Sequence, residues 1–183
     1  MPTHIALLRG INLGPHKRVA MPALRALVTS LGHTDVATYI ASGNVVFTAS
    51  SPAPGPELEK AIAAELGVEC RVVVLTCAEL ARAVADNPYP DEPDPKRVHA
   101  FFLPAEPDGA AREHVGQAQE RAAAKGSRDE AAIVGRVLYL HTPDGFGRSE
   151  LAAELSRGGR RNPAEGTARN WATVTRLLAM CAE

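Results

Sequence analysis

The chain has 183 residues, of which 45% are hydrophobic and 22% charged, and its formal net charge at pH 7 is −1. This is the composition of an ordinary globular protein with enough residues for one sizeable domain or two small ones. A net charge so close to zero argues against a dedicated nucleic-acid-binding domain, because such domains are usually basic. No apolar run reaches the roughly 18 to 20 residues that span a bilayer, and no secretory signal opens the chain. We therefore expect a cytoplasmic protein without a membrane partner.

The cysteines and histidines indicate neither a metal site nor a bound cofactor. Cys70, Cys77 and Cys181 have no metal-ligand spacing and form no CxxC motif. An odd number of cysteines without a secretory signal predicts reduced thiols in the cytoplasm. Cys70 and Cys181 are expected to be small core residues rather than nucleophiles. The six histidines have no zinc-site spacing either.

The first half of the chain alternates predicted strands and helices. Hydrophobic periodicity and turn residues predict strands at 5–8, 36–40, 45–47 and 71–75, with helices over 21–31 and 58–66. The resulting β-α-β-β-α-β order is that of ferredoxin-like domains. In that fold the first two strands are parallel and the third lies between them. We therefore expect Arg9, Asn12 and Lys17, after the first strand, to neighbour Ser42 and Asn44, between the second and third.

Four prolines between Asn87 and Pro95 predict a boundary between two parts of the chain. The expected organisation is a first subdomain with a connecting helix at 1–87, a linker at 88–96 and a second subdomain at 97–183. The second part has the predicted order β-α-β-β-α, with strands at 98–103, 131–134 and 137–140, and a final helix from about Ala168. The fold class is therefore α+β, with two ferredoxin-like subdomains, the second degenerate because its last strand is missing, plus a C-terminal helix.

The loop from Arg9 to Lys17 combines cationic side chains and glycines just ahead of a helix start. Arginine binds phosphate or carboxylate through its fork of donors, glycine lets a ligand approach the backbone, and helix N-termini favour anions. The loop is not a Walker A motif, because Gly10 and Gly14 are too close and no Ser or Thr follows Lys17. A solvated turn with a salt-bridged Arg9 is compatible with the same residues, so both interpretations stay open.

Two further segments offer polar side chains for such a site. Ser42 and Asn44 are either orienting donors at the same sheet edge or simply parts of a hairpin turn. Arg169 and Asn170 are placed in the first turn of the final helix, where an anion would be stabilised; alternatively, Thr167 caps that helix and Arg169 is solvated. The candidate ligand-binding residues are Arg9, Asn12, Lys17, Ser42, Asn44, Arg169 and Asn170. No catalytic residue is assigned.

Three segments carry a family resemblance: Leu7–Gly14 (LLRGINLG), Tyr39–Phe47 (YIASGNVVF) and Thr167–Val174 (TARNWATV). They closely resemble the bacterial family catalogued as domain of unknown function sixteen-ninety-seven. The resemblance implies a small cytoplasmic bacterial α/β protein with ferredoxin-like halves and supplies no catalytic residues. This chain differs from the usual family pattern at Pro15, where a second glycine is common, and at Ala168, where a threonine is.

The sequence is therefore compatible with three functions. The first is binding of a small anionic ligand, such as a phosphorylated compound, at the candidate residues. The second is a non-catalytic interaction module in which these turns are architectural. The third is nucleic-acid binding on the sheet, which requires exposed aromatic residues on the central strands. The first strand has no aromatic residue and the third offers only Phe47, so nucleic acid is not the expected partner.

Overall fold

The structure is a computed structural model that describes residues 1–157 and 166–183. The first half contains β1 (His4–Leu8), α1 (Met21–Ser30), β2 (Thr34–Tyr39), β3 (Asn44–Thr48), α2 (Pro54–Leu66), β4 (Val72–Thr76) and α3 (Cys77–Ala85). The second contains β5 (Val98–Phe102), α4 (Gly109–Ala124), β6 (Glu130–Val134), β7 (Val137–His141), η1 (Phe146–Arg148), α5 (Glu150–Ser156), β8 (Thr167–Asn170) and α6 (Trp171–Met180). The chain divides into unit 1, Met1–Arg82 with Thr175–Glu183, and unit 2, Ala83–Val174, and each is described by itself.

The sheet of unit 1 has the strand order β2-β3-β1-β4, with antiparallel neighbours throughout. β1 and β2 are therefore parallel to each other on either side of β3, as the sequence predicts. This is the arrangement of a ferredoxin-like domain. It brings the end of β1 beside the β2–β3 turn, because Leu7 pairs with Asn44 and the Leu8 N–H donates to the Gly43 carbonyl at 2.9 Å.

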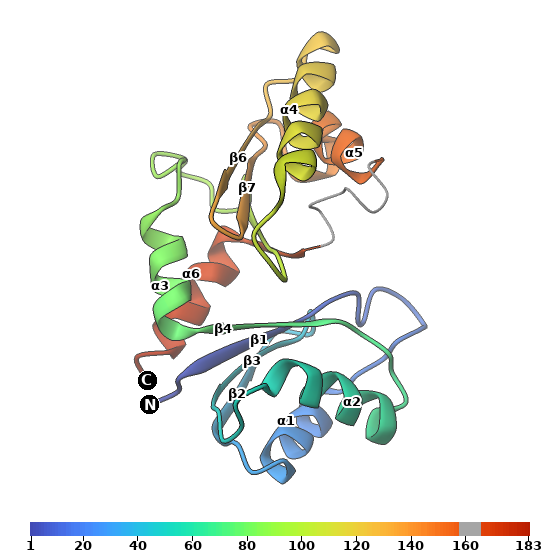
Figure 1. Ribbon diagram of the computed structural model, residues 1–183, viewed down its shortest axis with the longest axis vertical. Helices are drawn as coiled ribbons and strands as arrows, with labels where there is room; N and C mark the ends of the chain where they lie inside the picture. Colours follow the sequence, from blue (N-terminus) through green and yellow to red (C-terminus); the bar gives the residue numbers. More distant parts are fainter. Residues whose placement is uncertain (158–165) are drawn as a thin grey trace. The chain divides into compact units, whose positions relative to one another are not determined.

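Helices α1 and α2 lie together on one face of this sheet (Figure 1). Leu24 and Val28 of α1 and Leu58 and Ile62 of α2 are at most 1% exposed, in one core cluster with Phe47 of β3. Burying each such side chain stabilises the fold by about 1.5–3 kcal/mol relative to exposing it. The apolar stripes of the two helices thus attach them to the sheet and fix where their first turns lie.

Unit 2 is a second antiparallel sheet with the order β6-β7-β5-β8. Its core joins Phe101 of β5 and Leu138 of β7 to Val115 of α4 and to Leu151 and Leu155 of α5. The prediction of two ferredoxin-like subdomains is confirmed, since this order repeats that of unit 1.

The expected absence of the last strand in the second subdomain is corrected by β8. Residues predicted to open the final helix are a strand instead, with Thr167 paired to Phe102 and Asn170 paired to His99 of β5. Burial alternates along β8, as a strand requires, and the helix begins only at Trp171. The second ferredoxin-like sheet is therefore complete.

The proline-rich segment, predicted as a linker at 88–96, lies within unit 2. It is held there by a hydrogen bond of 3.0 Å from the Trp171 N–H to the Pro95 carbonyl and by a contact of 2.7 Å between Glu92 and His141. Tyr89 also stacks on the His141 ring, with 5.0 Å between ring centroids. The division of the chain accordingly falls between residues 82 and 83, and residues 175–183 belong to unit 1.

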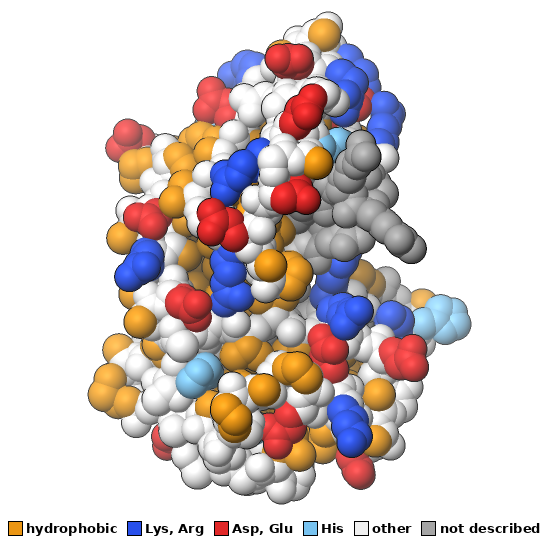
Figure 2. Space-filling model, in the orientation of Figure 1, with side chains coloured by type: hydrophobic (Ala, Val, Ile, Leu, Met, Phe, Trp, Pro, Cys, Tyr) orange, Lys and Arg blue, Asp and Glu red, His pale blue; other side chains and the backbone are white. Residues whose placement is uncertain are grey.

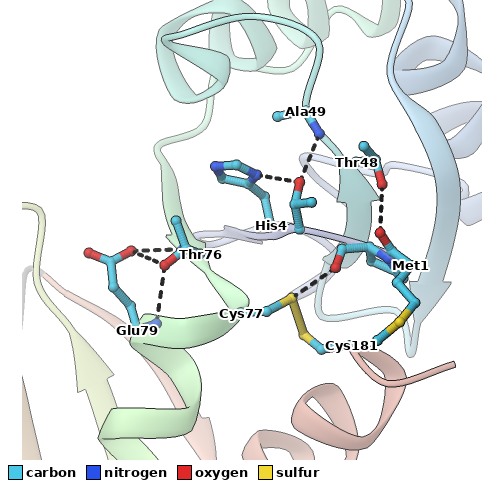
Figure 3. Close-up of a disulfide and its surroundings, with 10 residues drawn as sticks. Met1, His4, Thr48, Ala49, Thr76, Cys77, Glu79 and Cys181 are labelled. Atoms are coloured by element: carbon cyan, nitrogen blue, oxygen red, sulfur yellow. Dashed lines mark hydrogen bonds between the residues drawn. A yellow bond between two sulfur atoms is a disulfide. The ribbon is translucent and has the colours of Figure 1, made fainter.

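The cysteines differ from the predicted set of reduced thiols. Cys77, at the start of α3, and Cys181, just after α6, form a disulfide within unit 1 that joins residues 104 positions apart (Figure 3). The Cys77 N–H also donates to the Thr3 carbonyl at 2.9 Å, so the bond lies beside the first residues of the chain. Cys70 is the free cysteine.

Candidate functional site

The loop between β1 and α1 is organised by Asn12. Its side-chain oxygen accepts from the Val19 N–H at 2.9 Å, and its amide nitrogen donates to the Val19 carbonyl at 2.9 Å and to the Ala41 carbonyl at 2.8 Å. The Asn12 backbone has a φ of 54°, a left-handed conformation that asparagine tolerates better than most residues. With both amide hydrogens engaged, the predicted ligand-binding residue Asn12 holds the loop closed and joins it to the β2–β3 turn.

The turn between β2 and β3 packs directly on this loop through Gly43. A Cβ atom placed at Gly43 would lie 2.7 Å from the Ile11 Cδ1 and 2.9 Å from the Leu8 Cβ, and the Gly43 φ is 88°. Asn44 is fully buried, and its amide donates to the Tyr39 carbonyl at 2.8 Å and to the Ser42 hydroxyl at 3.1 Å. Asn44 therefore closes the turn from inside. The hydroxyl of the half-buried Ser42 accepts one of the two hydrogen bonds that the Asn44 amide donates.

A depression of about 730 Å³ opens beside the loop, within unit 1, and we call it the cationic cleft. Its charged lining consists of Arg9, Lys17, Lys60, Arg71, Glu59 and Glu69. Four cationic side chains thus face two carboxylates. Lys17 and Lys60 form no ion pair with the described part of the chain. On the face shown in Figure 2, charges of both signs are interspersed, which agrees with the net charge of −1.

Lys60 and Arg71 were not among the predicted site residues. Arg71 reaches the cleft because β4 pairs with β1, which brings the Arg71 carbonyl to 2.9 Å from the Arg9 N–H, whereas Lys60 is contributed by α2. Glu59, one turn of α2 from Ala63, accepts from the Val72 N–H at 2.9 Å and pairs with the Arg71 guanidinium at 3.4 Å. The strand order of a ferredoxin-like sheet is the signal from which Arg71 could have been expected beside Arg9.

Cys70 also lines the cleft, and its surroundings disfavour a thiolate. Burial raises the pKa of the Cys70 thiol, and the charge of Glu59 raises it further, against a smaller opposing effect of Lys17. The thiolate is the nucleophilic form of cysteine, so Cys70 is chemically quiet at neutral pH. This agrees with the expectation that it is not a nucleophile.

The remaining predicted residues, Arg169 and Asn170, belong to unit 2 and end β8 rather than opening a helix. Arg169 is 9% exposed, its guanidinium donates to the Ala168 carbonyl at 2.8 Å, and burial lowers its pKa to about 10. The Asn170 side-chain oxygen accepts from the Thr173 N–H at 2.9 Å and so caps α6, the role that the sequence suggested for Thr167.

The structure also bears on base stacking, metal binding and membrane insertion. Phe47, the aromatic residue of β3, is fully buried, so its ring is not available for stacking on a base. Among residues 1–157 and 166–183, no group of three or more histidine, cysteine or acidic side chains has a geometry that could hold a metal ion. No helix of that same part of the chain is both long and apolar enough to cross a membrane.

Comparison with known proteins places the chain in a family. The model of the family described as "Protein of unknown function (DUF1697)" matches residues 1–139. The chain belongs to this family. A solved structure, that of the conserved bacterial protein SP0830 from Streptococcus pneumoniae, is similar in fold with a TM-score of 0.70 and 21% sequence identity, over 98% of each chain. No curated protein matched the chain. The DUF1697 membership confirms the resemblance carried by the loop and turn motifs.

Proposed function

We propose that this DUF1697 protein binds a small anionic ligand, such as a phosphorylated compound, in the cationic cleft of unit 1. The observation that carries the proposal is the set of Arg9, Lys17, Lys60 and Arg71 around one depression, contributed by the β1–α1 loop, α2 and the residue before β4. The charged lining has four cationic side chains against the two carboxylates of Glu59 and Glu69, and an excess of positive charge in a cleft concentrates ligands of negative charge. Arginine forks and lysine ammonium groups are the usual partners of phosphate oxygens.

The fixed geometry of the loop supports this proposal. Asn12 ties the backbone between Asn12 and Val19 into a closed loop, in which the Asn12 N–H also donates to the Lys17 carbonyl at 3.0 Å. Lys17 itself has a φ of 54°. A cationic side chain on a pre-formed loop loses less conformational freedom on binding than one on a mobile segment.

The alternative is an interaction module in which the motif residues are architectural. The hydrogen bonds of Asn12 and Asn44 favour this role for those two residues, since their amides serve the loop and the turn. Both functions are compatible in one site: Asn12, Ser42 and Asn44 position the cleft, and the cationic side chains contact the ligand. The proposal also includes a bacterial cytoplasmic location, which the family resemblance implies. It assigns no reaction.

The test is a titration of the 15N-labelled full chain with inorganic phosphate at constant ionic strength, followed by 1H–15N NMR. We expect saturable shifts of the amides of residues 9–17, 60 and 71. Lys17→Ala and Lys60→Ala should each weaken phosphate binding by about fivefold or more, because each removes a charge-assisted contact.

Arg25→Ala serves as the matched control, since Arg25 is an exposed cation of unit 1 that contacts Thr38 on β2 and lies outside the cleft. It should leave the phosphate affinity unchanged. If Lys17→Ala, Lys60→Ala and Arg25→Ala weakened phosphate binding equally, the binding would depend only on the net charge of the chain, and the proposal would be contradicted. Linear, non-saturating shifts at residues 9–17 would also contradict the proposal.

A further inference from the structure

Unit 2 contains a second cavity that is independent of the cationic cleft. It has a volume of about 660 Å³, which lies within the range of small-molecule sites. It is lined by the start of β5, the loop after β7 and the last residue of β8. The residues that matter for its chemistry are Lys96, Arg97, His99, Asp144, Phe146 and Asn170.

His99, on the central strand β5, has an unusual environment for a histidine. Its ring stacks on Phe146, with 4.2 Å between centroids and 27° between planes. Its Nδ1 atom is buried and has no hydrogen-bond partner among the described residues. Burial lowers the pKa of His99 to about 4, so the imidazole is neutral at pH 7. A buried polar atom without a partner is costly, and such atoms in folded proteins call for an explanation.

Phe146 presents aromatic surface to the same cavity. It is 39% exposed although its ring is backed by His99. The residue follows Gly145, whose φ of 95° turns the chain into the short helix η1. The pair of rings forms a flat apolar wall, on which a third planar ring could stack in the offset geometry that aromatic groups prefer.

Asn170 supplies hydrogen-bond donors beside this wall. Its register partner on β5 is His99, so both side chains sit at the same level of the sheet. The Asn170 oxygen is fixed by the Thr173 N–H, whereas its amide nitrogen makes no hydrogen bond within the described ranges. An amide held in this way can donate to a ring nitrogen or carbonyl of a bound molecule.

Most charged side chains around the cavity are paired with one another, but the ammonium group of Lys96 is available to an anionic ligand. Arg97 lies 3.6 Å from Asp94, and Asp144 is paired with Arg128. Lys96 makes no ion pair within the described ranges, and its ammonium is therefore the charge that a ligand would meet. The positive end of the α6 dipole, behind Asn170, has the same sign.

We propose that this cavity binds a small planar heteroaromatic compound that carries an anionic group. The ring stacks on Phe146, accepts a hydrogen bond from the Asn170 amide, and directs its phosphate or carboxylate toward Lys96. A nucleoside monophosphate and a heteroaromatic carboxylate share this chemistry, and the two are separated by the probes used below.

The experiment uses the full chain, labelled for NMR at the histidine and phenylalanine rings, and four probes: adenosine 5′-monophosphate, nicotinate, adenosine and inorganic phosphate. We expect saturable shifts of the His99 and Phe146 ring signals with at least one of the first two. Adenosine lacks the anion and should bind more weakly than its monophosphate, and phosphate alone should leave both rings unaffected. Because ring signals of unit 2 are observed, binding at the cationic cleft of unit 1 does not interfere with the result.

Phe146→Ala should weaken binding of the preferred probe roughly fivefold to a hundredfold, as loss of aromatic stacking does elsewhere. Asn170→Asp keeps an oxygen to cap α6 but removes the amide donor, and it should weaken binding as well. Leu13→Ala, an exposed change in unit 1, is the control. The proposal is overturned if no probe shifts the His99 and Phe146 rings at millimolar concentration, if phosphate alone shifts them equally, or if Phe146→Ala binds as tightly as the parent chain.

Discussion

The amide of Asn12 donates to the carbonyl of Ala41 at 2.8 Å, across 29 residues of chain. This bond joins the loop after β1 to the turn after β2, two segments that the strand order of a ferredoxin-like sheet predicts to be neighbours. The same side chain makes two bonds to the Val19 backbone. One residue thus sets the conformation of the loop that carries Lys17.

Asn12→Ala should destabilise the chain by about 1–3 kcal/mol, because it removes three hydrogen bonds and leaves backbone groups of Val19 and Ala41 without this partner. Urea unfolding followed by far-UV circular dichroism measures the change. Leu13→Ala, at a neighbouring position that is 85% exposed, should change the unfolding free energy by less than about 0.5 kcal/mol. Equal effects of the two substitutions would show that Asn12 does not fix the loop.

Gly43→Ala should cost about 2–4 kcal/mol. The new methyl group would strain a backbone with a φ of 88° and collide with Ile11 and Leu8. Gly10→Ala separates the two effects, since Gly10 has a φ of 70° but no atom within 4 Å of an added Cβ. It should cost only about 1 kcal/mol. If the two variants unfold at the same urea concentration, the close packing of the turn on the loop does not contribute to the free energy of unfolding.

Reduction of the Cys77–Cys181 disulfide should lower the unfolding free energy by about 2–4 kcal/mol, because the bond closes a long loop in the unfolded chain. The measurement is thermal unfolding with and without dithiothreitol. Cys181→Ser should unfold at the lower temperature in both conditions, whereas Cys70→Ser should keep the full response to reductant. Alkylation of the chain unfolded in denaturant without reductant, followed by mass spectrometry, must find one free thiol, that of Cys70; three would contradict the disulfide.

Glu154 should make the stability of unit 2 depend on pH. This carboxylate is almost fully buried and accepts from Lys125 at 2.7 Å and from Arg121 at 2.9 Å, and these hydrogen bonds lower its pKa to about 2. Its ordinary pKa is 4.5. Since the folded pKa lies below the unfolded one, the stabilisation is complete above pH 4.5 and is lost as the pH falls toward 2.

The thermal midpoint of Glu154→Gln should therefore lie well below that of the parent chain at pH 6, and the two should converge as the pH falls from 4.5 to 2. Glu120→Gln, an exposed change on α4, is the control and should follow the parent curve throughout. A constant difference between Glu154→Gln and the parent over this range would mean that protonation of Glu154 is not responsible.

The sequence predicted the elements that have long apolar stripes or distinctive ends. Helices were found where residues 21–31 and 58–66 predicted them, as α1 (Met21–Ser30) and α2 (Pro54–Leu66), although α2 begins before the predicted start. Thr76 and Glu79 form a capping box at the start of α3, with the Glu79 N–H 3.1 Å from the Thr76 hydroxyl and the Thr76 N–H 2.7 Å from the Glu79 carboxylate. Segment 167–170 was predicted incorrectly for a local reason. Four residues are too few to establish a period of two, and both Thr167 and Asn170 are good helix caps. Pairing with β5 makes this segment a strand, and the helix therefore begins after Asn170.

The candidate site was predictable only where topology determined it. Arg9 and Lys17 carry their chemistry in the loop sequence itself, and the strand order predicts that this loop meets the β2–β3 turn, which it does through Asn12 and Ala41. Lys60 gave no local signal, because a lysine on an exposed helix face is ordinary. The partnership of Cys77 with Cys181 depends on how residues 104 positions apart come together, which no spacing rule encodes.

The return of residues 175–183 to unit 1 has a consequence for biosynthesis. Domains made early on the ribosome usually fold before the rest of the chain is finished. Here unit 1 lacks its last segment, including Cys181, until residues 175–183 have left the ribosome. A premature stop codon or a nascent-chain stall before residues 175–183 are made would therefore be expected to impair first the folding of unit 1, although most of that unit is synthesised early.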